Sequence, residues 1–288
     1  MKNNLMGLTS FLSTLLALST ALECSGQSVP VGVEFLDPIR RESRRGDNWC
    51  TTWAADGHQY TSMCDGYGWD PDRQREIHTE VFRISGTFEE VQGHALPSYA
   101  VDFNEVDATN RYMPYYFGYG IVAIGDVLYQ FLSRQNATNF MPPFQGINLI
   151  YSEDYGKTWY RFDGVEVTHT KLDYSGETQF FWQEQGVERE GKVGYAMSWI
   201  AVCQMGPGHT QGEQDGFVYL YAPNGSQVNE LNLARVSVGS LLDRSTYEYF
   251  DTQSADGSVH WTDNIEERGV IHTFPASNKE GDPFGWYS

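Results

Sequence analysis

The chain has 288 residues and a formal net charge of −19, from 38 acidic and 19 basic residues. This balance argues against nucleic acid or an anionic membrane as a partner, because phosphate binding needs clustered Lys and Arg. Four cysteines are too few for a disulfide scaffold, so a hydrophobic core must hold the fold. Aromatic residues make up 15% of the chain, which favours β-strands and surfaces that stack against sugar rings.

The N-terminus has the layout of an export signal. Lys2 precedes an uncharged run of apolar and small residues from Leu5 to Leu22, and Ser19-Thr20-Ala21 offers small residues for cleavage. A transmembrane anchor is the alternative, but Ser and Thr interrupt the run. We therefore expect a secreted, extracellular protein that has no membrane contact after cleavage. The expected divisions are a signal peptide at 1–21, a short N-terminal segment at 22–30 and a single domain at 31–288.

Short apolar or aromatic runs separated by Gly-containing turns recur along the chain, and helical periodicity is almost absent. The runs predict strands at Val31–Phe35, Trp49–Trp53, Gln59–Met63, Ile77–Ile84, Gly120–Ile124, Val127–Leu132, Ile147–Tyr151, Gly194–Val202 and Phe217–Tyr221. One short helix is predicted from Ser240 to Phe250, with Ser240 as its N-cap. The pattern indicates an all-β fold.

A turn followed by an aromatic strand recurs at irregular intervals. It occurs at Asp56–Tyr60, at Gly125–Tyr129 and at Asp215–Tyr219. Many short strands with Gly turns indicate a sandwich, a barrel or a propeller, and weak repeats favour the propeller.

Export would allow disulfides and glycans. Asp56-Gly57 is a hairpin signal, and a turn centred on Gly57 would place Cys50 opposite Cys64, so we predict a disulfide between them. Cys24 and Cys203 then either pair or leave Cys203 as a buried thiol. The sequons at Asn136 and Asn224 predict glycosylation in a eukaryotic secretory pathway.

The segment from Ser152 to Trp159 matches the Asp-box pattern Ser-x-Asp-x-Gly-x-Thr-Trp at every defined position. Its Ser and Asp side chains are expected to bond the backbone of a tight turn, while its Gly adopts a conformation that other residues avoid. The Trp is expected to pack between sheets. Because this role is structural, we use Asp154 to assign the fold and not the active site.

Further motifs occur in a recurrent order. They are Asp47-Asn48-Trp49, Thr52-Trp53, Asp56-Gly57-x-x-Tyr60-Thr61 and Asp65-Gly66, then the Asp-box, then Leu233-Ala234-Arg235-Val236, Asp243-Arg244 and Tyr247-Glu248-Tyr249-Phe250. From Val31 onward the chain thereby resembles the family called domain of unknown function 4185. The resemblance implies a five-bladed β-propeller similar to arabinanases and β-fructosidases, some of whose relatives look like arabinan-degrading glycoside hydrolases. Family members continue beyond the position of Ser288, which implies an incomplete last blade.

Glycoside hydrolysis ordinarily needs two carboxyl groups that face the scissile bond. Asp47 and Asp65 are the first candidates, because they open and close a predicted hairpin; a cap or a turn is their alternative role. Glu213, in the Gly-rich loop Gly206–Gly216, is a third candidate acid, with His209 as a donor to a sugar hydroxyl, although a plain connector is the alternative.

Trp49, Trp53 and Trp69 are candidates for a stacking platform, although a Trp within a strand more often belongs to the core. The seven scattered His residues and the cysteines predict no metal site, and no cofactor motif occurs, so we expect no cofactor. Calcium is compatible with an acidic propeller, but no motif indicates it.

We expect a monomeric, carbohydrate-active protein whose partner is a polysaccharide or oligosaccharide and whose activity is that of a glycoside hydrolase. The alternative is a non-catalytic glycan-binding propeller or an inactive truncated relative, and lyase chemistry on uronic acids stays open.

Overall fold

Strands dominate the part of the chain that the structure describes, and no α-helix occurs there. The computed structural model describes residues 46–64, 66–70, 72–74, 79–86, 91–96, 116–135, 144–167, 181–182, 187–189, 192–194, 197–212, 215–224 and 227–275. All of these belong to one compact unit, residues 41–288. The predicted all-β class is therefore confirmed, whereas the predicted signal peptide, the strand at Val31–Phe35, Cys24 and Asn136 lie outside the described residues.

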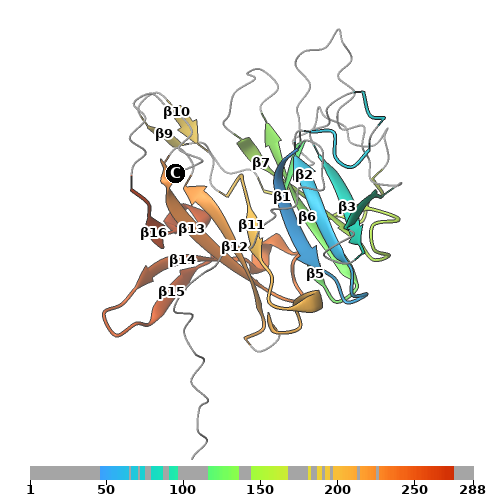
Figure 1. The fold of residues 1–288 in the computed structure, drawn as a ribbon. Helices are drawn as coiled ribbons and strands as arrows, with labels where there is room; N and C mark the ends of the chain where they lie inside the picture. Colours follow the sequence, from blue (N-terminus) through green and yellow to red (C-terminus); the bar gives the residue numbers. More distant parts are fainter. Residues whose placement is uncertain are drawn as a thin grey trace, which may run out of the picture. The chain divides into compact units, whose positions relative to one another are not determined.

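Three larger antiparallel sheets are built from consecutive strands in the described residues (Figure 1). The first sheet contains β1 (Asp47–Trp53), β2 (Gln59–Cys64), β3 (Glu80–Ser85) and β4 (Gln92–Ala95). The second contains β5 (Tyr116–Ile124), β6 (Val127–Gln135), β7 (Phe144–Ser152) and β8 (Tyr160–Arg161). The third contains β11 (Ala201–Cys203), β12 (Phe217–Asn224), β13 (Gln227–Ser237), β14 (Glu248–Gln253) and β15 (Val259–Thr262), with β16 (His272–Thr273) paired to β13. A separate small sheet pairs β9 (Val187–Arg189) with β10 (Lys192–Gly194).

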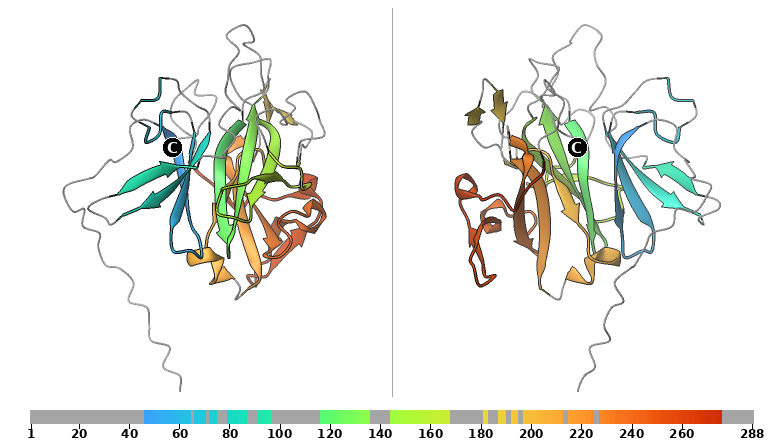
Figure 2. Two further views of the ribbon diagram at one scale, coloured as in Figure 1. Left: turned by 90° about the vertical axis from the view of Figure 1, so that its right-hand side faces the viewer. Right: turned by 60° about the vertical axis from the view of Figure 1, so that its left-hand side comes forward.

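The second sheet lies between the other two (Figure 2), and side chains on its two faces form two cores. One face packs against the first sheet, with Leu128, Leu132 and Ile150 beside Tyr60 and Val81. Side chains on the opposite face pack against the third sheet and include Val122, Phe131, Leu149, Val218, Leu220 and Val236. Because successive strand residues point to opposite faces, alternating apolar residues serve both cores. Fully burying each Val, Leu, Ile or Phe contributes about 1.5–3 kcal/mol.

The first strands of the three sheets are joined at one end by the side chain of Gln204, which directly follows β11. Its Oε1 accepts hydrogen bonds from Thr52 Oγ1 (2.9 Å) and Trp53 N (2.6 Å) on β1. Its Nε2 donates to Trp53 O (2.6 Å) and to Ala123 O (3.3 Å) on β5. Thus β1, β5 and β11 run in the same direction. We call the end where they begin the leading end, and the end where they finish the trailing end.

Turns at the trailing end explain the repeat in the sequence. Tyr60 Oη donates to Asp56 Oδ2 (2.7 Å), and Tyr219 Oη makes the same bond to Asp215 Oδ2 (3.0 Å). In both turns the other carboxylate oxygen accepts from the backbone N–H two residues later, at 2.9 and 3.0 Å. The Asp-Gly-x-x-Tyr repeat therefore marks equivalent hairpins of the first and third sheets.

The turn after β7 has the hydrogen bonds predicted from its sequence and also lies at the trailing end. Asp154 Oδ1 accepts from Ser152 Oγ (2.9 Å), Lys157 N (3.0 Å) and Thr158 N (2.8 Å). Gly156 has φ +84°, a conformation that favours glycine. Trp159 is 1% exposed and packs between the first and second sheets.

Two predictions of local structure were wrong. In place of a helix at Ser240–Phe250, a 3-10 turn at Arg244–Thr246 is capped by Asp243 and leads into β14. Because β14 pairs with both β13 and β15, tertiary pairing prevails over the weak local helix signal. The strand predicted at Gly194–Val202 is interrupted, because Met197 adopts φ +49°, which no strand contains.

The predicted disulfide between Cys50 and Cys64 was also wrong. The hairpin pairs Trp53 with Gln59, so it is centred on Asp56 and not on Gly57. This shift places Ser62 opposite Cys50, and a bulge near Asn48 places Asp47 opposite Cys64. Cys50 is consequently a free thiol, and so is Cys203.

Replacing Gln204 with Leu should lower the free energy of unfolding by about 3 kcal/mol, because four hydrogen bonds are lost and two of the partners, Thr52 and Ala123, stay buried. Urea denaturation measures the change. Gln253→Leu is the matched control, because Gln253 is exposed and its side chain donates only to Gly257 O within the described residues. Equal stability of the two variants would contradict the role of Gln204.

The stabilising effect of Asp154 should depend on pH. Desolvation alone would raise the pKa of Asp154, but the bonds from Thr158, Ser152 and Lys157 outweigh it and hold the pKa below 3.8. A lowered carboxyl pKa stabilises the fold above about pH 4 and ceases to do so as the pH falls through the folded-state pKa. We expect Asp154→Asn to lose about 1 kcal/mol at pH 7. Urea midpoints should converge with those of the wild type as the pH falls through the folded-state pKa of Asp154, which lies below 3.8; a constant difference would contradict this.

Candidate functional site

The leading end brings together residues from all three sheets. Asp47 begins β1 and is exposed, and its cross-strand partner is Cys64 at the end of β2. Cys64 is buried beside Phe117 and Tyr119 of β5 and beside Trp199, which shortly precedes β11. Tyr119 lies 4.9 Å from Trp199 and 6.1 Å from Phe117, measured between ring centroids. A carboxylate and an aromatic cluster thus meet where the first strands begin.

Two residues at this end hold strained backbone conformations. Asn48, directly after Asp47, has φ +51°, and Met197, two residues before Trp199, has φ +49°. Non-glycine residues rarely adopt this region, which costs of order 1–3 kcal/mol, and such residues cluster at functional sites. The Met197 carbonyl accepts a hydrogen bond from Trp182 Nε1 (2.8 Å), which helps to hold the conformation. Tyr155 and His209, in turns at the trailing end, also have positive φ (+59° and +60°), so backbone strain occurs at both ends of the sheets.

Asp47 is therefore placed as an exposed carboxylate, as its candidate role requires. Asp65 and Glu213, the other candidate carboxylates, lie outside the described residues and stay predictions.

The three predicted platform residues do not gather at Asp47. Trp49 and Trp69 pack edge to face, with centroids 4.8 Å apart, in a cluster with Met63 and Phe82. Trp53 is 45% exposed, but it ends β1 at the trailing end. Trp53 lies six residues after Asp47 along the strand, which corresponds to a distance of about 20 Å. Strand direction therefore separates Trp53 from the other two residues, whereas Trp49 lies two residues from Asp47 on β1 and packs against Trp69.

His209, the candidate hydrogen-bond donor to a sugar hydroxyl, is buried within its own loop. Its side chain is 1% exposed, in a 3-10 turn (Pro207–His209) at the trailing end. Nδ1 accepts from Met205 N (3.2 Å), which leaves the proton on Nε2 for Phe217 O (3.1 Å). Both ring nitrogens therefore serve the loop, whose Gly208 carbonyl accepts from Gly125 N (2.9 Å).

The side chain of Asn224, in a predicted sequon, takes part in a polar network. Its Nδ2 donates to Glu230 Oε2 (2.6 Å), and its Oδ1 accepts from Arg268 Nη2 (2.9 Å). Arg268 also donates to Asn232 Oδ1 (3.2 Å) and Ile265 O (2.8 Å). The amide thus anchors the segment before β16, and its glycosylation stays a prediction.

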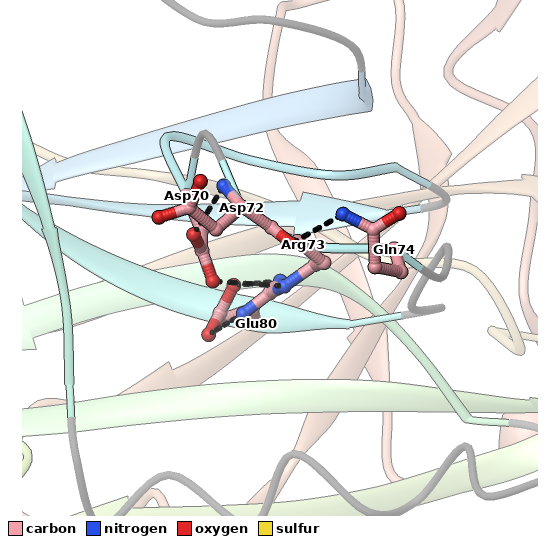
Figure 3. A network of polar contacts seen from close by, with 5 residues as sticks. All are labelled: Asp70, Asp72, Arg73, Gln74 and Glu80. Carbon is pink, nitrogen blue, oxygen red and sulfur yellow. Dashed lines mark hydrogen bonds and ion pairs between the residues drawn. The ribbon is translucent and has the colours of Figure 1, made fainter.

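A buried ion pair near the leading end was missed by the sequence analysis (Figure 3). Glu80 begins β3 and is 1% exposed, and its two oxygens accept from Arg73 Nη1 (2.5 Å) and Nη2 (2.9 Å). Asp70 Oδ2 lies 3.9 Å from Arg73 Nε. The signal was present in the sequence, because a charged residue at a buried strand position needs a partner.

The pKa values of both members of this pair are raised, but for different reasons. Desolvation raises the pKa of Glu80, although Arg73 opposes the rise. Hydrogen bonds to Glu80 raise the pKa of Arg73. Because both oxygens of Glu80 are engaged by Arg73, the pair anchors the loop carrying Trp69 and does not offer a reactive carboxylate.

The described residues contain no group of three or more His, Cys, Asp or Glu side chains arranged to hold a metal ion. No helix among them is long and apolar enough to span a membrane.

Comparisons with known proteins do not identify a family. No family model matches the chain, and no curated protein matches it. Among solved structures, the chain is similar to a proposed hydrolase from Bacteroides ovatus, with 14% identity and a TM-score of 0.38. The match covers 76% of this chain but 54% of that one, so the chain spans about half its length. A similarity this weak carries no argument about function, and the resemblance to domain of unknown function 4185 stays a prediction.

Arg73→Ala should lower the free energy of unfolding by about 3–5 kcal/mol, because it leaves the Glu80 carboxylate buried and unpaired. The double variant Arg73→Met/Glu80→Leu should recover most of this loss, because no charge is then buried. Urea denaturation of the wild type, the single variant and the double variant measures these changes in the free energy of unfolding. A double variant as unstable as Arg73→Ala would show that lost packing, and not the unpaired charge, causes the effect.

Proposed function

We propose that the protein is a secreted, carbohydrate-active β-propeller, most simply a five-bladed one, that hydrolyses glycosidic bonds of a polysaccharide such as an arabinan. One observation carries the proposal: Asp47 is exposed at the leading end, where the first strands of three neighbouring sheets begin. In a propeller, the ends of such inner strands surround the central axis.

Three features support the propeller part of the proposal. The sheets are consecutive antiparallel meanders, and β5 lies beside both β1 and β11. Equivalent Asp–Tyr turns recur in the first and third sheets. The Ser152–Trp159 turn lies at the trailing end, away from Asp47, as the resemblance implies for an Asp-box.

The proposed chemistry needs a second carboxyl group. We propose Asp65 for this role, because it directly follows Cys64, whose Cα is paired with that of Asp47. One group would protonate the leaving oxygen, while the other would act as base or nucleophile.

Asp47→Asn should reduce product release at least 100-fold, because it removes an ionisable group from a catalytic pair. The test is reducing-sugar release by the purified protein from arabinans, fructans and uronic-acid polysaccharides. Asp263→Asn is the matched control, because Asp263 is an exposed turn residue that follows β15.

Equal rates for the wild type and Asp47→Asn would remove Asp47 from the mechanism. Binding of a glycan without any product would favour the alternative function, a non-catalytic glycan-binding propeller.

A further inference from the structure

Trp199 differs from the neighbouring residues in the segment that leads into β11. Met197 and Ile200 are 0% and 1% exposed and belong to the core between the second and third sheets. Trp199 is half-buried and packs in the other direction, onto the cluster at the leading end. Trp199 therefore keeps part of its surface exposed, unlike Trp159 and Trp182, which are 1% and 0% exposed.

The indole of Trp199 rests on a rigid support. Tyr119 beneath it is 4% exposed, with the two rings tilted by 48°, and Phe117 stacks on Tyr119 at 11°. Cys64, which is 1% exposed, completes the support from the first sheet. A buried support of this kind limits the rotamers of Trp199, so a ligand that contacts the indole loses little side-chain entropy on binding.

The backbone before Trp199 is held as well. Met197 is kept in its left-handed conformation while its carbonyl accepts from Trp182 Nε1, and Trp182 is itself fully buried. Strain of this size persists only where the surrounding structure enforces it. The fold thus maintains the position from which Trp199 projects.

We propose that Trp199 is the aromatic platform on which a sugar ring of a neutral glycan stacks at the leading end, beside Asp47. This inference rests on the proposed function and names its substrate class. An indole offers an apolar face to the C–H groups of a sugar ring. Neutral glycans are favoured over uronic-acid polymers because the formal net charge of −19 repels polyanions.

The test measures the dissociation constants of the purified protein for arabinan, inulin and polygalacturonate by affinity electrophoresis. Trp199→Ala should weaken binding of the neutral glycan about fivefold to tenfold, as expected for the loss of one aromatic contact. Trp199→Phe should stay within about threefold of the wild type, because it keeps a ring on Tyr119. Trp53→Ala is the matched control, because Trp53 is exposed at the trailing end, and it should bind like the wild type.

The outcomes separate this inference from the proposed function. If the wild type cleaves a glycan in an Asp47-dependent way but Trp199→Ala binds as well as Trp53→Ala, the platform is overturned and the proposed function stands. Binding of polygalacturonate alone would overturn the neutral substrate class. Absence of both binding and cleavage in the wild type would overturn both proposals. Urea midpoints of the variants show whether each is folded, and Trp199→Phe keeps the test decisive if Trp199→Ala is not.

Discussion

The amide of Gln204 connects the first strands of three sheets, and the geometry of the leading end depends on this connection. An amide can accept and donate at once, so one side chain bonds both the N–H and the C=O of Trp53 while also reaching Thr52 and Ala123. Since β1, β5 and β11 are joined where they finish, their beginnings lie together at the opposite end. Asp47, Tyr119 and Trp199 owe their proximity to that arrangement.

The two ends of the sheets differ in how their turns are built. At the trailing end, Asp56, Asp154 and Asp215 each bond the backbone of their own turn, and His209 has both ring nitrogens engaged. Polar groups used in this way stabilise turns but are not available to a ligand. At the leading end, the carboxylate of Asp47 is exposed, and the half-buried Trp199 packs on Tyr119. This contrast is why the proposed function is assigned to the leading end.

Buried polar interactions also anchor the segments that surround the site. Arg73 and Glu80 tie the loop carrying Trp69 to β3, and the network of Asn224 and Arg268 ties the segment before β16 to β13. Each charged group in these contacts is hydrogen-bonded, to an opposite charge in the first case and to amide or carbonyl groups in the second, which reduces the cost of removing it from water. Local sequence indicates that a buried charge needs a partner, but it does not reveal which residue is that partner, because the two belong to different structural elements.

The sequence by itself determined the all-β class, most first and second strands of the sheets, the turn at Ser152–Trp159 and the place of Asp47 at a strand start. These features follow from alternation, turn residues and glycine conformations, which act over a few neighbouring residues. It did not predict β13, although Asn232, Ala234 and Val236 alternate inward there, since its polar residues obscure the pattern.

Only the tertiary structure decided the register of the first hairpin. Moving the centre of the turn by one residue changes the pairing by two positions, which places Cys50 opposite Ser62 and not Cys64. The tertiary structure likewise decided that Trp53 and His209 lie at the trailing end while Trp199 joins Asp47 at the leading end. Which residues meet depends on how three sheets are joined by long-range hydrogen bonds, such as those of Gln204 to residues of β1 and β5. Such contacts cannot be predicted from the spacing of residues along the chain.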